Sequence, residues 1–196
     1  MMRRLYLLLP LLAAFAPTAA AQYAQATSED YAVYRAALQA EPWRRLLPTS
    51  SAPIVVDRET YPLVAEVVFF HQPMRVREGI DSSTVDAMRD MHGEPGRLSA
   101  DSLGLPRSVE ISAEANDSLF ASADTTVRGW DRFHARFGAG ARTLSLSRVA
   151  FNRDHTQAIV DVTERCEGRC GHAETLLLDQ KDGHWVVARQ IVVMSY

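Results

Sequence analysis

The chain has 196 residues, of which 47% are hydrophobic and 23% charged, a balance typical of globular proteins. That composition excludes a disordered low-complexity chain and a collagen-like chain. With 21 basic against 24 acidic residues, the net charge of −3 excludes the basic footprint of a nucleic-acid-binding protein. We therefore expect a folded protein with no nucleic-acid partner.

Residues 1–21 have the three parts of a secretory signal peptide. Two arginines precede the apolar run Leu5–Ala16, and three alanines end the segment where a signal peptidase would read small residues. The run contains Pro10 and is shorter than the ~18–20 apolar residues that a bilayer crossing needs. The pattern predicts cleavage between Ala21 and Gln22, no membrane anchor, and a periplasmic or secreted soluble protein.

The first half of the remaining chain alternates helical and extended patterns. Residues 22–28 are expected to form a loose leader, and 29–196 a single domain. Apolar residues at helical spacing predict a helix from Glu29 to Glu41, with Thr27 and Ser28 as candidate caps. Pro42 follows and disfavours helical geometry in the residue before it.

The middle of the chain carries weaker patterns. A short buried strand is expected at 53–57, and 63–70 is compatible with either a strand or a helix. A short helix is expected after Ser83, ending at Gly93. The Gly, Pro, Ser and Asp content of 93–106 predicts a surface loop.

The last third predicts a β-sheet. A helix carrying Trp130, Phe133 and Phe137 on one stripe precedes four strands, at 143–151, 157–163, 173–180 and 184–195. Asp182-Gly183 is a two-residue hairpin signal, and alternating residues of the last strand from Trp185 to Val193 are expected to face inward. Sequential strands with short turns predict an α+β fold, a four-stranded antiparallel meander with helices packed on one face.

The two cysteines lie in the turn between the second and third strands of this meander. Bridged cysteines need Cα atoms about 4.4–6.8 Å apart, whereas four extended residues span roughly 13 Å. The turn expected around Gly168 allows the approach, and an exported protein meets oxidising conditions. We therefore predict a Cys166–Cys170 disulfide that closes the hairpin loop.

The sequence leaves two alternative roles for these cysteines, a redox pair and a zinc site. A redox pair would normally have two intervening residues at a helix N-terminus, whereas this pair has three in a turn. A zinc site could use Cys166, Cys170 and His172 but needs a fourth ligand. His155 and His184 lie in turns at the opposite end of the meander, roughly 25 Å away along the strands, so neither can supply it.

A few other residues are candidates for a ligand pocket. Trp130, Phe133 and the flanking His134 could floor a pocket, although a core-facing helix also explains them. Arg148 and Asp161 interrupt adjacent strands, and could form a charged site or, as we expect, a solvated ion pair on an exposed face. His155 and His184 could approach each other across neighbouring turns, where polar residues are common.

A set of residues in the C-terminal part and the first helix forms a recognisable pattern: Tyr31, Tyr34, Trp130, Phe133, Leu146-Ser147-Arg148-Val149-Ala150-Phe151-Asn152, Gln157-Ala158, Cys166, Cys170-Gly171 and Gly183-His184-Trp185-Val186-Val187. This pattern resembles a family of uncharacterised exported bacterial proteins. The resemblance covers 125–196 and, more loosely, the first helix; Ala150 and Glu167 stand where that family usually has glycine. It implies the fold and export, and no activity is established for the family.

The sequence contains no catalytic motif that would identify an enzyme. It has no Gly-x-Ser-x-Gly, no His-Glu-x-x-His, no phosphate loop and no dinucleotide fingerprint. A binding or interaction module without a cofactor is the expected class, with an unknown small ligand or protein as partner. A curved sheet crossed by a helix could hold a small hydrophobic ligand. The alternative is a secreted hydrolase that uses the polar face of the sheet, or a thiol oxidoreductase.

Overall fold

The computed structural model describes residues 23–41, 43–46, 52–61, 63, 79–91, 95–121, 126–168 and 170–195. The expected signal peptide at 1–21 lies outside these ranges, as does 63–70 apart from Leu63. The elements, in chain order, are β1 (Ala24–Gln25), α1 (Ser28–Gln39), α2 (Trp43–Leu46), β2 (Ile54–Asp57), α4 (Ser82–Asp90), β3 (Gly96–Arg97), η2 (Ala100–Leu103), β4 (Ser108–Ile111), α5 (Ala113–Phe120), α6 (Thr126–Phe137), β5 (Arg142–Leu146), β6 (Ala150–Phe151), β7 (Gln157–Arg165), β8 (His172–Lys181) and β9 (His184–Ser195).

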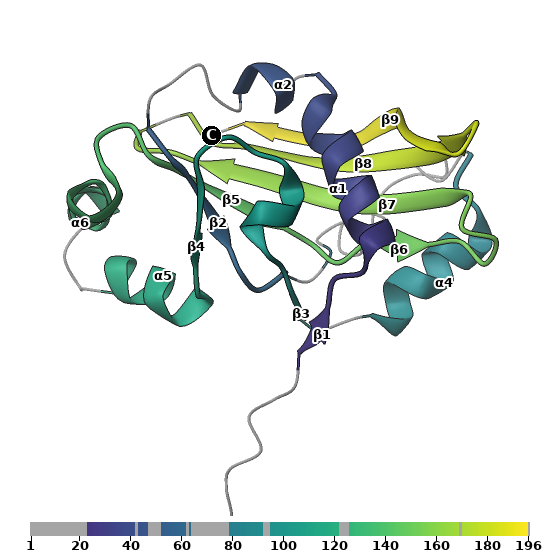
Figure 1. The fold of residues 1–196 in the computed structure, drawn as a ribbon, viewed down its shortest axis with the longest axis horizontal. Helices are drawn as coiled ribbons and strands as arrows, with labels where there is room; N and C mark the ends of the chain where they lie inside the picture. The colour runs from purple at the N-terminus through teal and green to yellow at the C-terminus, as the bar shows by residue number, and fades with distance from the viewer. Residues whose placement is uncertain are drawn as a thin grey trace, which may run out of the picture.

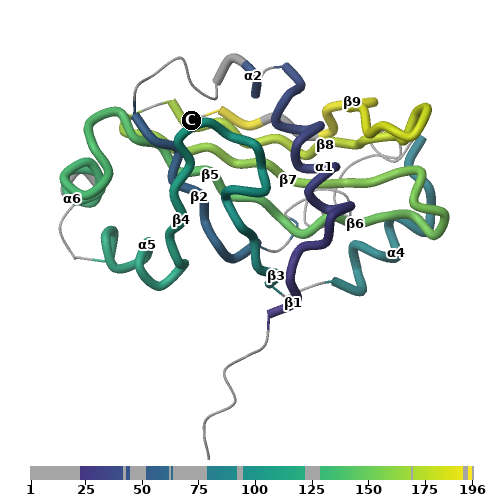
Figure 2. Tube along the Cα trace, in the orientation of Figure 1, coloured from purple at the N-terminus to yellow at the C-terminus, as the bar shows by residue number. Residues whose placement is uncertain are grey.

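One large sheet organises the described chain, in the order β4-β2-β5-β7-β8-β9, with β6 paired to β7. The strands from β5 onward pair antiparallel, which confirms the α+β class and the C-terminal meander. The sheet also has a parallel part that the sequence analysis did not predict, because β2 pairs parallel with both β4 and β5. Figure 2 follows this path from the early strands β2 and β4 to the late strand β9.

Helices cover both faces of the sheet, not the single face that was expected. α1 lies across β7, β8 and β9 (Figure 1), and its apolar residues pack with Ile54 and Val56 of β2 in one core cluster. Val55, between them, faces the other way and packs with Phe133 of α6. α4 covers the second face at the other end of the sheet, where Met88 packs against Ile159. The strands alternate apolar residues on both faces, so each face needs its own cover.

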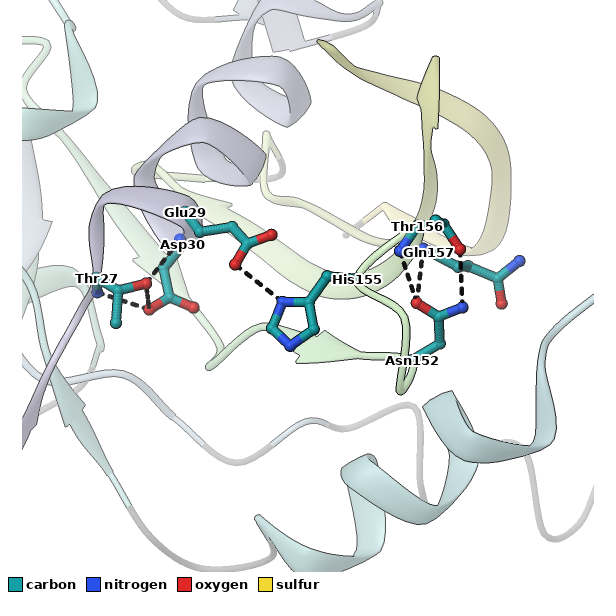
Figure 3. Close-up of polar contacts among 7 residues, drawn as sticks. All are labelled: Thr27, Glu29, Asp30, Asn152, His155, Thr156 and Gln157. Atoms are coloured by element: carbon teal, nitrogen blue, oxygen red, sulfur yellow. Dashed lines mark hydrogen bonds and ion pairs between the residues drawn. The ribbon is translucent and has the colours of Figure 1, made fainter. Parts of the chain in front are cut away.

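The start of α1 is fixed by its cap and by a contact with the sheet. The side chain of Thr27 accepts a hydrogen bond from the Asp30 amide, and the Asp30 carboxylate accepts one from the Thr27 amide. This capping box satisfies amides that the first helical turn leaves unpaired. Figure 3 shows the second contact, in which Glu29 pairs with His155 in the turn after β6 (Oε2–Nδ1 2.9 Å). α1 is therefore anchored at its N-terminus to the sheet that it crosses.

The turns of the meander form where the sequence predicted them. Asp182 and Gly183 have φ values of 51° and 76°, the left-handed geometry that a two-residue hairpin requires. In the turn after β6, the Asn152 side-chain oxygen accepts hydrogen bonds from the amides of Thr156 and Gln157 (Figure 3). The first expected strand, 143–151, is divided into β5 and β6.

Three expectations about buried and exposed segments were wrong. The described part of the predicted surface loop, 95–106, is not exposed throughout, because it contains β3 and η2 and buries Leu98, Ala100 and Leu103. The leader is not loose throughout, because β1 pairs in parallel with β3. Alternation along β9 is also interrupted. Register shifts opposite β8 place Val187 on the α1 face and Ile191 on the α4 face, since each extra residue reverses which side chains face inward.

Cys166 and Cys170 form the predicted disulfide, with their Cα atoms 5.7 Å apart. The bridge closes the turn between β7 and β8 at the end of the sheet opposite the Asp182-Gly183 hairpin. None of the helices in the described ranges has the length and apolarity of a bilayer-spanning segment.

Removing the disulfide is expected to lower the free energy of unfolding by about 2 kcal/mol. A crosslink that closes so short a loop restricts the unfolded chain by about that amount in the chain-entropy description. Urea denaturation of a Cys166→Ser/Cys170→Ser variant measures the loss, and wild-type protein unfolded in the presence of a reductant is the matched control. Equal midpoints for oxidised wild type and the double variant would contradict the prediction.

Candidate functional site

Asp57 is a carboxylate at the end of a buried strand. β2 runs between two parallel neighbours, which places its last residue beside Ser145 of β5. The Ser145 hydroxyl donates a short hydrogen bond to Asp57 Oδ2, and Asn116 Nδ2 of α5 donates to Oδ1 at 3.0 Å. Two neutral donors from different elements therefore hold the carboxylate in one orientation.

A row of side chains extends from Asp57 across the sheet. Ser145 is the Cα partner of Thr163 on β7, Thr163 is the partner of Ala173 on β8, and Ala173 is the partner of Met194 on β9. Cross-strand partners point to the same face, and this face is the one opposite α1. The row is polar near Asp57 and apolar toward β9.

The elements around Asp57 are joined by further hydrogen bonds. Tyr61, which follows β2, bonds through its hydroxyl to the Thr163 hydroxyl at 3.0 Å. Glu59 accepts a hydrogen bond from the Ala113 amide at 2.8 Å, at the first residue of α5, and pairs with the Arg58 guanidinium at 3.1 Å. Glu59 thus satisfies an amide that the start of α5 leaves free and fixes the helix that carries Asn116.

These residues enclose a pocket of about 530 Å³ above the row. Small-molecule sites usually lie between roughly 300 and 1,000 Å³, so the pocket is large enough for a small ligand. Its walls combine carboxylates and hydroxyls with apolar side chains. The lining residues are Tyr23, Asp57, Glu59, Thr60, Tyr61, Pro95, Ala113, Asn116, Asp117, Ser145, Thr163, Arg165, Ala173 and Met194.

The protein shifts the proton affinity of the carboxylate in this pocket. Burial raises the pKa of Asp57 above its usual value, and the hydrogen bond from Ser145, the charge of Arg165 and the hydrogen bond from Asn116 oppose that rise. Burial removes water that would stabilise the ionised form, so a positive charge that replaced this water would be favoured beside Asp57. In the described part of the chain, the buried Asn116 Oδ1 has no hydrogen-bond partner.

The aromatic candidates from the sequence form core and do not line this pocket. Trp130 is 7% exposed and Phe133 is fully buried, in a cluster with Val55 and Ile111. The core-facing interpretation of this stripe is therefore confirmed. His134, beside it, lies within 3.5 Å of the Glu167 carboxylate in the cysteine loop.

Arg148 and Asp161 occupy different environments. Asp161 is 4% exposed and accepts a hydrogen bond from the Thr175 hydroxyl at 2.6 Å, so the expected solvated pair on an exposed face is wrong. Arg148 lines a smaller pocket of about 180 Å³ beside β1 and β3. Neither residue lines the Asp57 pocket.

The histidine candidates also have specific neighbours. His172 contacts Glu174 through Nε2 at 2.8 Å and Ser195 through Nδ1 at 3.2 Å. Among the described residues, no three His, Cys, Asp or Glu side chains are grouped as metal ligands. His155 pairs with Glu29, while His184 is the Cα partner of Lys181 across the hairpin.

Sequence analysis did not identify Asp57, Asn116, Ser145 or Thr163 as members of one site. The available signal was a charged residue that ends the apolar segment at 53–57, and polar residues that alternate with Leu144 and Leu146. Their convergence depends on the parallel pairing of β2 with β5 and on α5, and neither was predicted. Comparison with known proteins adds no further evidence: no protein-family model, curated protein or solved structure matches the chain.

Proposed function

We propose that the protein is an exported binding module that holds a small, positively charged ligand in the Asp57 pocket. The single observation that carries the proposal is the fixed carboxylate of Asp57, placed by Ser145 and Asn116 at the wall of a cavity of about 530 Å³. The Cys166–Cys170 disulfide supports export, because such bonds persist in oxidising compartments.

The charges of the lining favour a cation. Three carboxylates, Asp57, Glu59 and Asp117, line the pocket with one guanidinium, Arg165. Glu59 is already engaged by Arg58 and by the start of α5. Among the described residues, the hydrogen-bond donors on the oxygens of Asp57 are neutral, and an ammonium group would add a charged donor to them. Charge-assisted hydrogen bonds of this kind are stronger than neutral ones.

The remaining walls describe the rest of the ligand. Tyr61, Ser145 and Thr163 contribute hydroxyls to the lining, and that of Ser145 bonds to the carboxylate, whereas Ala173 and Met194 contribute apolar side chains toward β9. A short aliphatic amine matches both halves, with its nitrogen near Asp57 and its carbon chain against Met194. This lining favours a charged ligand over the purely hydrophobic ligand considered from the sequence.

Calorimetric titration with butylamine, and with 1-butanol as an uncharged molecule of about the same size, tests the proposal. We expect butylamine to bind and the alcohol to bind at least about 10-fold more weakly, because only the amine brings a charge to Asp57. Asp57→Asn keeps the side-chain volume and is expected to cost about 2 kcal/mol, or about 30-fold in affinity. Asp117→Asn, which removes an exposed carboxylate of the same pocket, is the matched control with a smaller loss.

The pH dependence of binding identifies the carboxylate involved. Because burial raises the pKa of Asp57, butylamine should lose affinity as the pH falls through that raised value, where the carboxylate becomes protonated. In Asp57→Asn this loss should disappear. Equal binding of the amine and the alcohol, or an Asp57→Asn variant that binds butylamine as wild type does, would disprove the proposed function.

A further inference from the structure

A hydrogen-bond chain on the α1 face of the sheet joins four side chains that the Asp57 pocket does not use. Trp43 Nε1 donates to Glu174 Oε2 at 2.8 Å, His172 Nε2 lies 2.8 Å from Glu174 Oε1, and His172 Nδ1 lies 3.2 Å from Ser195 Oγ. From these contacts we propose that Ser195 is a nucleophile activated by His172 and Glu174, and that it takes acyl groups from esters.

The chain of contacts fixes the protonation of the imidazole. The Glu174 carboxylate can only accept hydrogen bonds, so the ring nitrogen facing it, Nε2, carries the proton. Nδ1 of the neutral ring is then the acceptor for the hydroxyl proton of Ser195. The order of nucleophile, base and orienting carboxylate is that of a catalytic triad, but the two ring nitrogens are exchanged: Nδ1 faces the serine and Nε2 faces the carboxylate.

The exposed fraction of the side chains rises from Glu174 through His172 to Ser195, as a serine nucleophile with a buried orienting acid requires. The side chain of Glu174 is 1% exposed and that of His172 is 14% exposed, while Ser195 is exposed on the edge strand β9. The Trp43 ring packs edge-on against His172 with centroids 5.2 Å apart. A buried acid and a packed aromatic ring hold the base in place, and the hydroxyl remains accessible to a substrate.

A second carboxylate faces the same imidazole. Glu164 on β7 is the Cα partner of His172 and is fully buried; its Oε1 pairs with Arg142 at 2.7 Å. Its Oε2 is buried and accepts no hydrogen bond from the described residues. When His172 takes the proton of Ser195, the new positive charge would therefore contact Glu174 and have Glu164 as its cross-strand neighbour, and Glu174 contributes the direct stabilisation.

The reaction balances with water as the only co-reactant. Ser195 Oγ bonds to the carbonyl carbon of the ester while its proton passes to His172 Nδ1. The carbon–oxygen bond to the leaving alcohol then breaks, and that alcohol takes the proton from His172. Water, activated by the same imidazole, releases the carboxylic acid and restores the serine.

Labelling of the full chain with a fluorophosphonate probe, followed by mass spectrometry of the C-terminal peptide, tests the proposal. We expect Ser195 to react at least about 10-fold faster than Ser118, an exposed serine whose hydroxyl instead donates to the Ala115 carbonyl. His172→Ala should slow the reaction at Ser195 by about 100-fold or more, as removal of a general base does. Ser195→Ala should abolish labelling of this peptide.

The labelling rate of folded variants separates a catalytic base from a merely structural histidine. A structural histidine would leave the rate at Ser195 close to that of wild type once folding is matched, whereas loss of a base in contact with the hydroxyl lowers it. Thermal melts of each variant confirm folding; Ser195→Ala, at an exposed position, is expected to melt as wild type does. Ser195 reacting no faster than Ser118, or at a rate independent of His172, would overturn the proposal. The Asp57 pocket lies on the opposite face, so the outcome of either experiment leaves the other unaffected.

Discussion

Replacing Phe133 with alanine is expected to lower the free energy of unfolding by about 3–5 kcal/mol, the usual cost of deleting a buried aromatic ring. Phe133 is fully buried and its ring contacts Trp130 and Phe137, with centroids 5.2 and 4.9 Å away. It packs α6 against Val55 of β2.

Urea denaturation measures this loss, and Phe137→Ala is the matched control. Phe137 is on the same helix and partly exposed, so its truncation should cost less than half as much. If the two variants had the same midpoint, α6 would not be held by the described cluster, and its position beside the sheet would need revision.

Replacing Trp43 with alanine is the second large effect that we expect, again about 3–5 kcal/mol. Trp43 is fully buried, and it is the residue through which the short helix α2 contacts the sheet at Glu174. Its loss removes both apolar burial and the donor to a carboxylate that is itself 3% exposed. When a buried carboxylate loses a hydrogen bond, the free energy spent on removing it from water is no longer offset by that bond, and the folded state is destabilised.

The variant Trp43→Phe separates these two contributions. It keeps an aromatic ring and removes the indole N–H, so the expected loss is about 1.5–3 kcal/mol from the unpaired oxygen of Glu174. Combining it with Glu174→Leu, which removes the accepting oxygen, in a double-mutant cycle measures the coupling between the two side chains. A coupling energy of zero would contradict the Trp43–Glu174 hydrogen bond.

The parts of the fold that were predicted are those specified locally. Asp182-Gly183 needs only its own backbone geometry to form a hairpin, and β7 and β8 are long enough for their alternation to be unambiguous. The cysteines are separated by four positions, so the turn that joins their strands also brings them together. In each case the determining residues are neighbours in the sequence.

The parts that were not predicted depend on contacts between distant residues. β4 has two exposed residues in its middle, and α5 has no fully buried residue, so neither carries a clear periodic pattern. β2 finds its parallel partners more than 50 and about 90 residues later. The Asp57 pocket combines β2, α5, β5 and β7, and could not be assembled from the sequence without these pairings.

The hydrogen-bonded residues around Ser195 could also be predicted from the sequence only in part. His172 and Glu174 are separated by one residue and so share a face of β8, which the sequence alone implies. Trp43 and Ser195 reach that face only through the tertiary packing of α2 and the pairing of β9. A search for short catalytic motifs therefore finds none, although the structure brings a serine, a histidine and a glutamate into contact.

The crossing of α1 over β7, β8 and β9 has a consequence for the order of folding. The helix precedes β7, β8 and β9 in the chain, with β2, η2 and β4 between them. Its apolar side also packs with Ile54 and Val56 of β2, so the core that it covers draws on both ends of the described chain. The first helix and the last hairpins must therefore be present together before this core is complete, and folding cannot proceed by finishing one end before the other.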